Sequence, residues 1–101
     1  MSISQPTLVV NRHIEAFDIY IGRPSIWGNP FSHVAYYADA ALVVTLVGSR
    51  TEAIERYREW IQTQPQLLAK LHTLKGKRLG CWCAPKRCHG EILAELADEL
   101  P

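Results

Sequence analysis

Every cysteine of the chain, together with one of its histidines, lies in the short segment between Cys81 and His89. Thiols and imidazoles are the side chains that bind soft metals or act as nucleophiles near neutral pH. Core packing alone does not readily account for their concentration in one segment. This segment is therefore the first candidate for a chemical site, although it does not by itself name a reaction.

Cys88 lies where a helix is expected to begin, because Cys88-His89-Gly90-Glu91 resembles a capping box. The positive end of that helix, with Lys86 and Arg87 beside it, would favour the thiolate over the thiol. Cys88 is thus a candidate nucleophile, and His89 is a candidate proton carrier. Adjacent helical residues point in different directions, so the base for Cys88 could instead come from His13, His33 or His72.

Two other interpretations of this segment stay open. The first is a zinc site with four sulfur and nitrogen ligands: Cys81, Cys83, Cys88 and His89. The ligand count suits zinc, but one residue between the first two cysteines and none between the last two ligands is a poor match to familiar zinc spacings. The second interpretation is structural, with the cysteines acting as small buried hydrophobic residues under a tight turn. No cofactor is expected on the first hypothesis, and zinc is the alternative.

A second special segment runs from Gly22 to Phe31, where two glycines, two prolines and an asparagine preclude a regular strand. Arg23 offers a fork of donors suited to phosphate or carboxylate. Trp27 and Phe31 could stack on a base, although a rigid connection with buried aromatic rings is an equally good interpretation. The residues predicted to bind a ligand are Arg23, Trp27, Asn29, Cys83 and Lys86.

The elements around these segments predict an α/β fold. Short apolar or alternating runs at 8–11, 17–21, 42–47 and 79–83 are typical of strands, and 34–47 could form a hairpin. A capping box at Ser49 to Glu52 begins a helix with an apolar stripe through 61. A shorter helix over 67–74 ends at Gly76, and a last helix spans 91–100. We expect a single compact domain at 8–101, after a flexible N-terminus at 1–7. It should have a small mixed sheet, about three helices and a Rossmann-like strand-to-helix site near its C-terminal end.

Composition indicates the class of protein and the cellular compartment in which it is expected. The chain has 101 residues, of which 48% are hydrophobic and 21% are charged, as in an ordinary globular domain. No apolar run is long enough to cross a bilayer, and three cysteines without a leader fit a reducing cytoplasm better than a disulfide framework. The net charge is only +1, yet the stretch from Trp60 to Gly90 contains no acidic residue. Its positive charges could attract phosphate or form a solvated face: Lys70, Lys75, Lys77, Arg78, Lys86 and Arg87.

Several motifs together resemble a known family. They are Tyr20-Ile21-Gly22-Arg23-Pro24, Trp27-Gly28-Asn29-Pro30-Phe31, Ala53 to Trp60, Gly76-Lys77, Cys81-Trp82-Cys83-Ala84-Pro85 and Cys88-His89-Gly90. In this order they resemble the domain of unknown function 4326 (DUF4326), found in bacteria and their phages, over about residues 8 to 98. The resemblance implies no settled reaction. It implies that the family motifs feature Arg23, Asn29, Cys81, Cys83, Cys88 and His89.

The residues favour a small cytoplasmic domain, of a bacterial cell or a phage-infected host, without a membrane partner. It would bind a phosphate-bearing small molecule or a nucleic-acid fragment between the Gly22 to Phe31 loop and the Cys83 to Gly90 turn. Whether it modifies that ligand, and so whether it is an enzyme, is left open. The alternative is a non-catalytic interaction module whose Cys/His turn is held by zinc.

Overall fold

The computed structural model describes residues 5–23, 25–33 and 45–100. Three short strands form the main sheet: β1 (Leu8–Asn11), β2 (Ile19–Tyr20) and β5 (Arg78–Cys81). Their order is β1-β5-β2, and β5 pairs in parallel with both neighbours. A second parallel pair joins β3 (Phe31–Ser32) to β4 (Thr45–Leu46). Parallel strands need crossover connections, and helices described below lie in the chain between β2 and β5.

Helix α1 (Arg50–Ile61) begins where the sequence predicted, because the Oγ of Ser49 accepts a hydrogen bond from the Glu52 amide at 3.1 Å. Its apolar stripe packs into the core through Ala53, Ile54, Tyr57 and Ile61. The predicted second helix is shorter and is broken in two: α2 (Pro65–Leu68) is followed by a 3₁₀ turn at Leu71–Thr73. Gly76 then adopts a φ of +75°, a left-handed conformation that favours glycine and ends the helical region.

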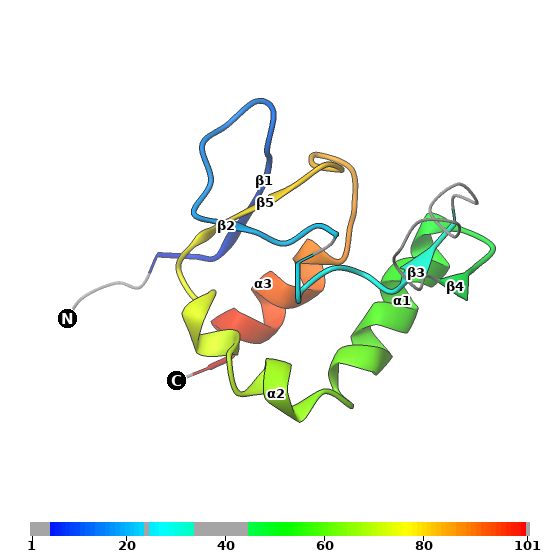
Figure 1. The fold of residues 1–101 in the computed structure, drawn as a ribbon. Helices are drawn as coiled ribbons and strands as arrows, with labels where there is room; N and C mark the ends of the chain where they lie inside the picture. The colour runs from blue at the N-terminus through cyan, green and yellow to red at the C-terminus, as the bar shows by residue number, and fades with distance from the viewer. Residues whose placement is uncertain (1–4, 24, 34–44, 101) are drawn as a thin grey trace.

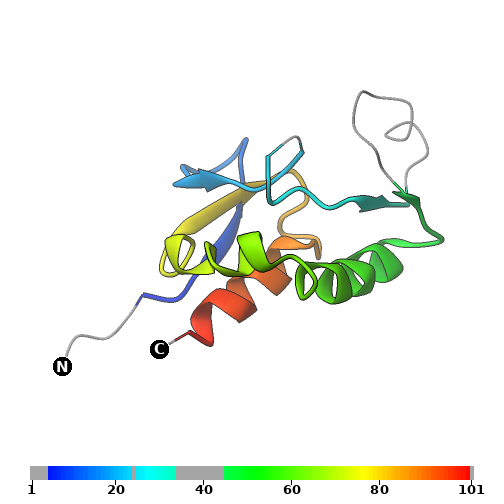
Figure 2. The ribbon, with the colours of Figure 1, turned by 60° about the horizontal axis from the view of Figure 1, so that its bottom comes forward.

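Helix α3 (Gly90–Asp98) closes the fold and buries Ile92, Leu93 and Ala97. It starts very close to the sheet, since a Cβ atom built on Gly90 would lie 2.7 Å from the Ile21 side chain. Figures 1 and 2 show α1 and α3 packed on the same side of the main sheet, with the β3–β4 pair beside the start of α1. The core is therefore a sheet covered by helices, which confirms the predicted α/β fold.

The ends of the described chain are joined. Thr7 donates its Oγ1 proton to the Asp98 carboxylate at 2.6 Å, and its Oγ1 accepts a hydrogen bond from the Gly76 amide at 2.9 Å. Thr7 is only 6% exposed, so these hydrogen bonds attach it to the rest of the domain. The predicted hairpin at 34–47 lies outside the described residues except for its last part, which contains β4. Among the described helices, none is long and apolar enough to span a membrane.

Candidate functional site

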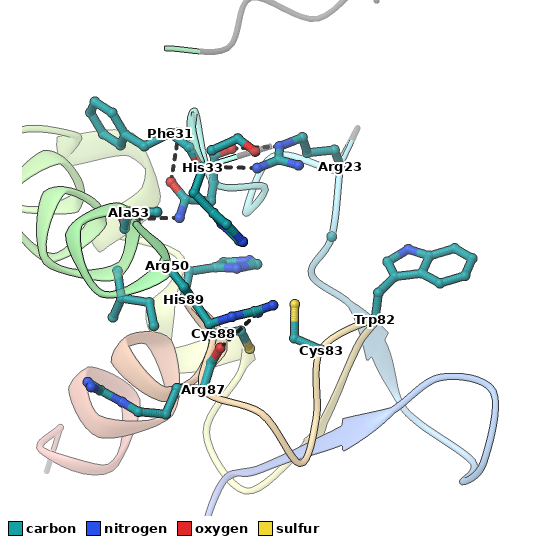
Figure 3. Close-up of a pocket in the computed structure, with 14 residues that line it drawn as sticks. Arg23, Phe31, His33, Arg50, Ala53, Trp82, Cys83, Arg87, Cys88 and His89 are labelled. Atoms are coloured by element: carbon teal, nitrogen blue, oxygen red, sulfur yellow. Dashed lines mark hydrogen bonds between the residues drawn. The ribbon is translucent and has the colours of Figure 1, made fainter. Parts of the chain in front are cut away.

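A pocket of about 240 Å³ lies where the two special segments of the sequence meet. The segment from Gly22 to His33 forms one side, the turn from Trp82 to His89 forms another, and the first turns of α1 complete it (Figure 3). The turn follows directly after β5, so the site lies at the carboxyl end of a parallel strand, where α/β sheets commonly bind ligands. The residues that line the pocket are Gly22, Arg23, Asn29, Phe31, Ser32, His33, Arg50, Ala53, Ile54, Trp82, Cys83, Arg87, Cys88 and His89.

Arg23 and Asn29 shape the first side of the pocket. Arg23 donates from Nε to the Asn29 carbonyl at 2.8 Å and from Nη2 to the Phe31 carbonyl at 3.1 Å. The Asn29 side chain donates to the Ala53 carbonyl of α1 at 3.1 Å and accepts from the Phe31 amide at 2.9 Å. Both predicted ligand-binding residues thus line the pocket, and both also bind the backbone that forms it.

Trp27 has a different position from the one predicted for it. Its side chain is 4% exposed and packs in the core, and Trp27 does not line the pocket. Its carbonyl accepts a 2.7 Å hydrogen bond from the buried hydroxyl of Tyr57, which fixes the loop to α1. The predicted stacking of Trp27 on a base is therefore wrong for this conformation. Aromatic rings reach the pocket instead from Phe31, His33 and Trp82.

The three cysteines come together, but with different surroundings. Cys81 and Cys88 are buried, and the Cys88 thiol lies 3.5 Å from the Cys81 sulfur. Cys83 is half-buried and lines the pocket. Hydrogen bonding to the other two sulfurs and burial both raise the pKa of Cys88, so it stays a protonated donor. The sequence predicted a lowered pKa at Cys88, and the structure gives the opposite.

Cys83 is the pocket-lining thiol whose pKa is lowered most. The hydrogen bond from Cys88 lowers its pKa most, a hydrogen bond from Arg50 and the charges of Arg50 and Arg23 add to the effect, and burial opposes it; the resulting pKa is about 5. The same Cys88 hydrogen bond also lowers the pKa of Cys81, to about 6. Cys88 has one S–H proton and cannot serve both sulfurs at once. We assign the negative charge to Cys83, because the two arginines act on it.

Arg50 is the residue that sequence reasoning missed. It is the first residue of α1, and Figure 3 shows its side chain directed into the pocket, toward Cys83. It also donates to the Arg87 carbonyl at 3.3 Å. A cation in the first turn of a helix opposes the helix dipole, which favours negative charge there. That unfavourable placement, directly after a clear N-cap, was a signal that Arg50 serves something other than helix stability.

His89 lies deep in the same pocket. Its Nε2 is 2.7 Å from the Ile21 carbonyl, and its ring packs edge-on against Tyr57. Burial lowers its pKa to about 4, with the charge of Arg23 acting in the same direction and the Ile21 carbonyl opposing. A carbonyl only accepts, so neutral His89 must carry its proton on Nε2. The ring Nδ1 is then left as a base.

The start of α3 is displaced by one residue from the prediction. His89 is its N-cap, while the Cys88 sulfur accepts a 3.3 Å hydrogen bond from the Gly90 amide. Lys86, which was predicted to bind phosphate, is exposed and does not line the pocket. Arg87 does line it, although its Nε lies 3.4 Å from the Glu91 carboxylate and its side chain points away from Cys83 in Figure 3.

The proposed zinc ligands are not arranged as a metal site. Within 5–23, 25–33 and 45–100, no group of three or more histidine, cysteine, aspartate or glutamate side chains has an arrangement that could hold a metal ion. His89 directs Nε2 at the Ile21 carbonyl, and Cys81 accepts from the Cys88 thiol and the Ala84 amide.

Comparison with known proteins places the chain in a family. No solved structure matches it. It is 36% identical over 103 residues to an uncharacterized 12.4 kDa protein in the nrdA-td intergenic region of Enterobacteria phage T4, an alignment that covers 98% of this chain and 84% of the phage protein. The profile of DUF4326, a domain of unknown function, matches residues 9–99, as the motifs around Arg23 and Cys83 indicated. The chain therefore belongs to the DUF4326 family.

Proposed function

We propose that the protein binds a nucleotide, or the phosphate-bearing end of a nucleic acid, in the pocket between the Gly22 to His33 segment and the Trp82 to His89 turn. One observation carries the proposal: Arg23, Arg50 and Arg87 line the pocket, and among its described lining residues there is no carboxylate. An arginine presents several donors to a phosphate and keeps its charge at any physiological pH. Such a lining suits an anion.

The shape of the pocket suggests how a nucleotide would lie. A volume of about 240 Å³ is below the usual range for drug-sized ligands, so a phosphate and part of a sugar would fill it. The base would then lie at the rim. Trp82 lines the pocket and is 54% exposed, so its ring offers a stacking surface there. In this proposal Trp82 stacks on the base, the role that the sequence predicted for Trp27.

The decisive experiment compares Arg50→Ala with Arg56→Ala. Both residues are on α1, but Arg56 pairs with Glu52 on the surface and does not line the pocket. Thermal shift and calorimetric titration would use nucleoside mono-, di- and triphosphates, and short oligonucleotides with and without a 5′-phosphate. We expect binding by the wild type and Arg56→Ala that is lost in Arg50→Ala. No binding by the wild type across this panel would refute the proposal.

The zinc-held interaction module makes a different prediction. It requires stoichiometric zinc in protein purified without added metal, with its thiols protected from alkylation and the zinc lost in Cys88→Ser. The nucleotide-binding proposal instead expects one fast-reacting thiol at Cys83. A thiolate of this kind needs a reducing compartment, which supports a cytoplasmic location as part of this proposal.

A further inference from the structure

The proposed function leaves one group of the pocket unused, the half-buried thiol of Cys83. We propose that Cys83 is the nucleophile of a phosphomonoesterase, which hydrolyses a phosphate monoester through a cysteinyl-phosphate intermediate. This inference rests on the proposed binding of a phosphate-bearing ligand in the same pocket. It adds the class of reaction and the residue that performs it.

The position of Arg50 supports the proposal, because a phosphate bound there would lie next to Cys83. Arg50, Arg23 and Cys83 all line the pocket, and both arginines act on the Cys83 sulfur so as to lower its pKa. Figure 3 shows the side chains of Arg50 and Cys83 directed toward each other across the pocket. A phosphate held by the Arg50 guanidinium therefore lies against the sulfur. The atom nearest the nucleophile would be phosphorus, whereas the sugar and base extend toward the rim at Trp82.

The surroundings of the sulfur suit nucleophilic attack. Cys88 stays protonated, with its S–H directed at the buried Cys81 sulfur at 3.5 Å, so Cys88 and Cys83 do not compete as nucleophiles. Cys81 is 2% exposed and does not line the pocket, which leaves Cys83 as the accessible thiolate. Arginine N–H groups around a transferring phosphoryl group stabilise the charge on its oxygens in the transition state.

The reaction has two balanced steps. In the first, the Cys83 thiolate attacks phosphorus, the S–P bond forms, the P–O bond to the alcohol breaks, and the leaving oxygen takes a proton from solvent or from the ring of His33. In the second, water attacks phosphorus and the S–P bond breaks, which returns the electron pair to sulfur as the thiolate. The proton of that water passes to solvent. The products are one alcohol and one inorganic phosphate.

The test measures release of inorganic phosphate by the full chain from p-nitrophenyl phosphate, from nucleoside 5′-monophosphates and from a 5′-phosphorylated oligonucleotide. The last two substrates separate a free nucleotide from a nucleic-acid end. We expect turnover of at least one of them, unchanged in Arg56→Ala. Cys83→Ser should reduce it on the order of a thousandfold or more, because the nucleophile is removed. Acid quenching with a phosphorus-labelled substrate should leave the label on the peptide that contains Cys83.

Binding measured in parallel distinguishes the two proposals. Cys83→Ser should still show the ligand-dependent thermal shift, since the arginines are intact, and that shift also demonstrates that the variant is folded. Phosphate binding without phosphate release or labelled Cys83 would overturn the nucleophile and leave the binding proposal standing. Turnover by Cys83→Ser at the wild-type rate would overturn it as well. Absence of binding by the wild type would refute both the binding proposal and the nucleophile proposal.

Discussion

At the scale of single residues, the site depends on how charge is divided among three neighbouring sulfurs. Cys88 keeps its proton and donates it, and Cys83 carries the negative charge because Arg50 and Arg23 act on it. The thiol at the helix start is therefore the protonated donor, and the thiol with the lowered pKa, Cys83, lies five residues earlier in the turn. The assignment of the charge has a direct chemical consequence, which is the pH at which Cys83 reacts.

Alkylation of Cys83 by iodoacetamide should follow a titration near pH 5, since the thiolate is the reacting form and the pKa of Cys83 is about 5. The rate should be high at neutral pH and should fall as the pH drops through 5. Arg50→Ala removes a hydrogen bond and a charge, so it should move the midpoint upward by roughly one pH unit or more. Peptide mass spectrometry identifies the labelled residue, and Arg56→Ala is the control. Preferential labelling of Cys88, or a wild-type midpoint near 9, would contradict this assignment.

His89 should make the stability of the domain depend on acid. Its folded pKa of about 4 lies below the usual value of 6.5, so the unfolded chain binds the proton more readily. The contribution is complete above pH 6.5 and is lost as the pH falls through 4; its size is on the order of 3 kcal/mol. Urea unfolding between pH 4 and 7 measures it. His89→Gln, which keeps a donor for the Ile21 carbonyl, should flatten the pH dependence, whereas the exposed His72→Gln should leave it unchanged. Equal slopes in all three proteins would show that His89 is not the source.

The sequence singled out the segment that lines the pocket, but it placed the lowered pKa at Cys88, whereas in the structure the pKa of Cys83 is lowered and that of Cys88 is raised. The cysteines and the helix start are local features, so their concentration between Cys81 and His89 is visible without a structure. The proton distribution depends on Arg50 and Arg23, which come from segments that lie far away in the sequence. Trp27 shows the same limit, because its burial depends on the packing of α1.

At the scale of elements, α1 and the loop before β3 form one unit. The Tyr57 hydroxyl and the Asn29 amide make the two buried bonds between them, to the Trp27 and Ala53 carbonyls. Arg50 begins the same helix, so these bonds fix it relative to Arg23. The positions of Arg50 and Arg23 in the pocket are thus fixed by hydrogen bonds that would not themselves contact a bound ligand.

Tyr57→Phe should destabilise the domain and weaken ligand binding together. The substitution leaves the Trp27 carbonyl buried without its 2.7 Å hydrogen bond, a loss of about 1 to 3 kcal/mol. Urea unfolding gives the first quantity and calorimetric titration with the ligand found for the wild type gives the second. Thr63→Ala removes an exposed bond to the Trp60 carbonyl just after the same helix, and should change stability by less than about 0.5 kcal/mol. A Tyr57→Phe protein as stable as Thr63→Ala would show that α1 does not hold the loop through this bond.

Elements with local signals were predicted well, and those that depend on distant partners were not. Neighbouring residues alone determine four features: the Ser49 cap, the apolar stripe of α1, the end of the helical region at Gly76, and the strand before the cysteine turn. The parallel order β1-β5-β2 and the pairing of β3 with β4 join segments far apart in the chain. No periodicity within a strand specifies its neighbour.

At the scale of the whole molecule, charge is nearly balanced but is not evenly placed. The net charge is +1, and the ion pairs among the described residues, Arg56–Glu52, Arg58–Glu95 and Arg87–Glu91, are solvent-exposed. Exposed pairs of this kind contribute roughly 0 to 1 kcal/mol each to stability. The fold therefore depends mainly on its apolar core and buried hydrogen bonds, whereas the pocket depends on charge.

This separation predicts that salt acts on binding and on stability to different extents. Screening shortens the reach of charges from about 14 Å at 50 mM salt to about 4 Å at 500 mM, so the dissociation constant for a phosphate-bearing ligand should rise several-fold over that range. The melting temperature of the unliganded protein should change little, because its exposed ion pairs contribute little. Calorimetric titrations and thermal unfolding in the same salt series measure the two effects. An affinity that does not vary with salt would mean that apolar or stacking contacts, such as those of Trp82, hold the ligand in place of the arginines.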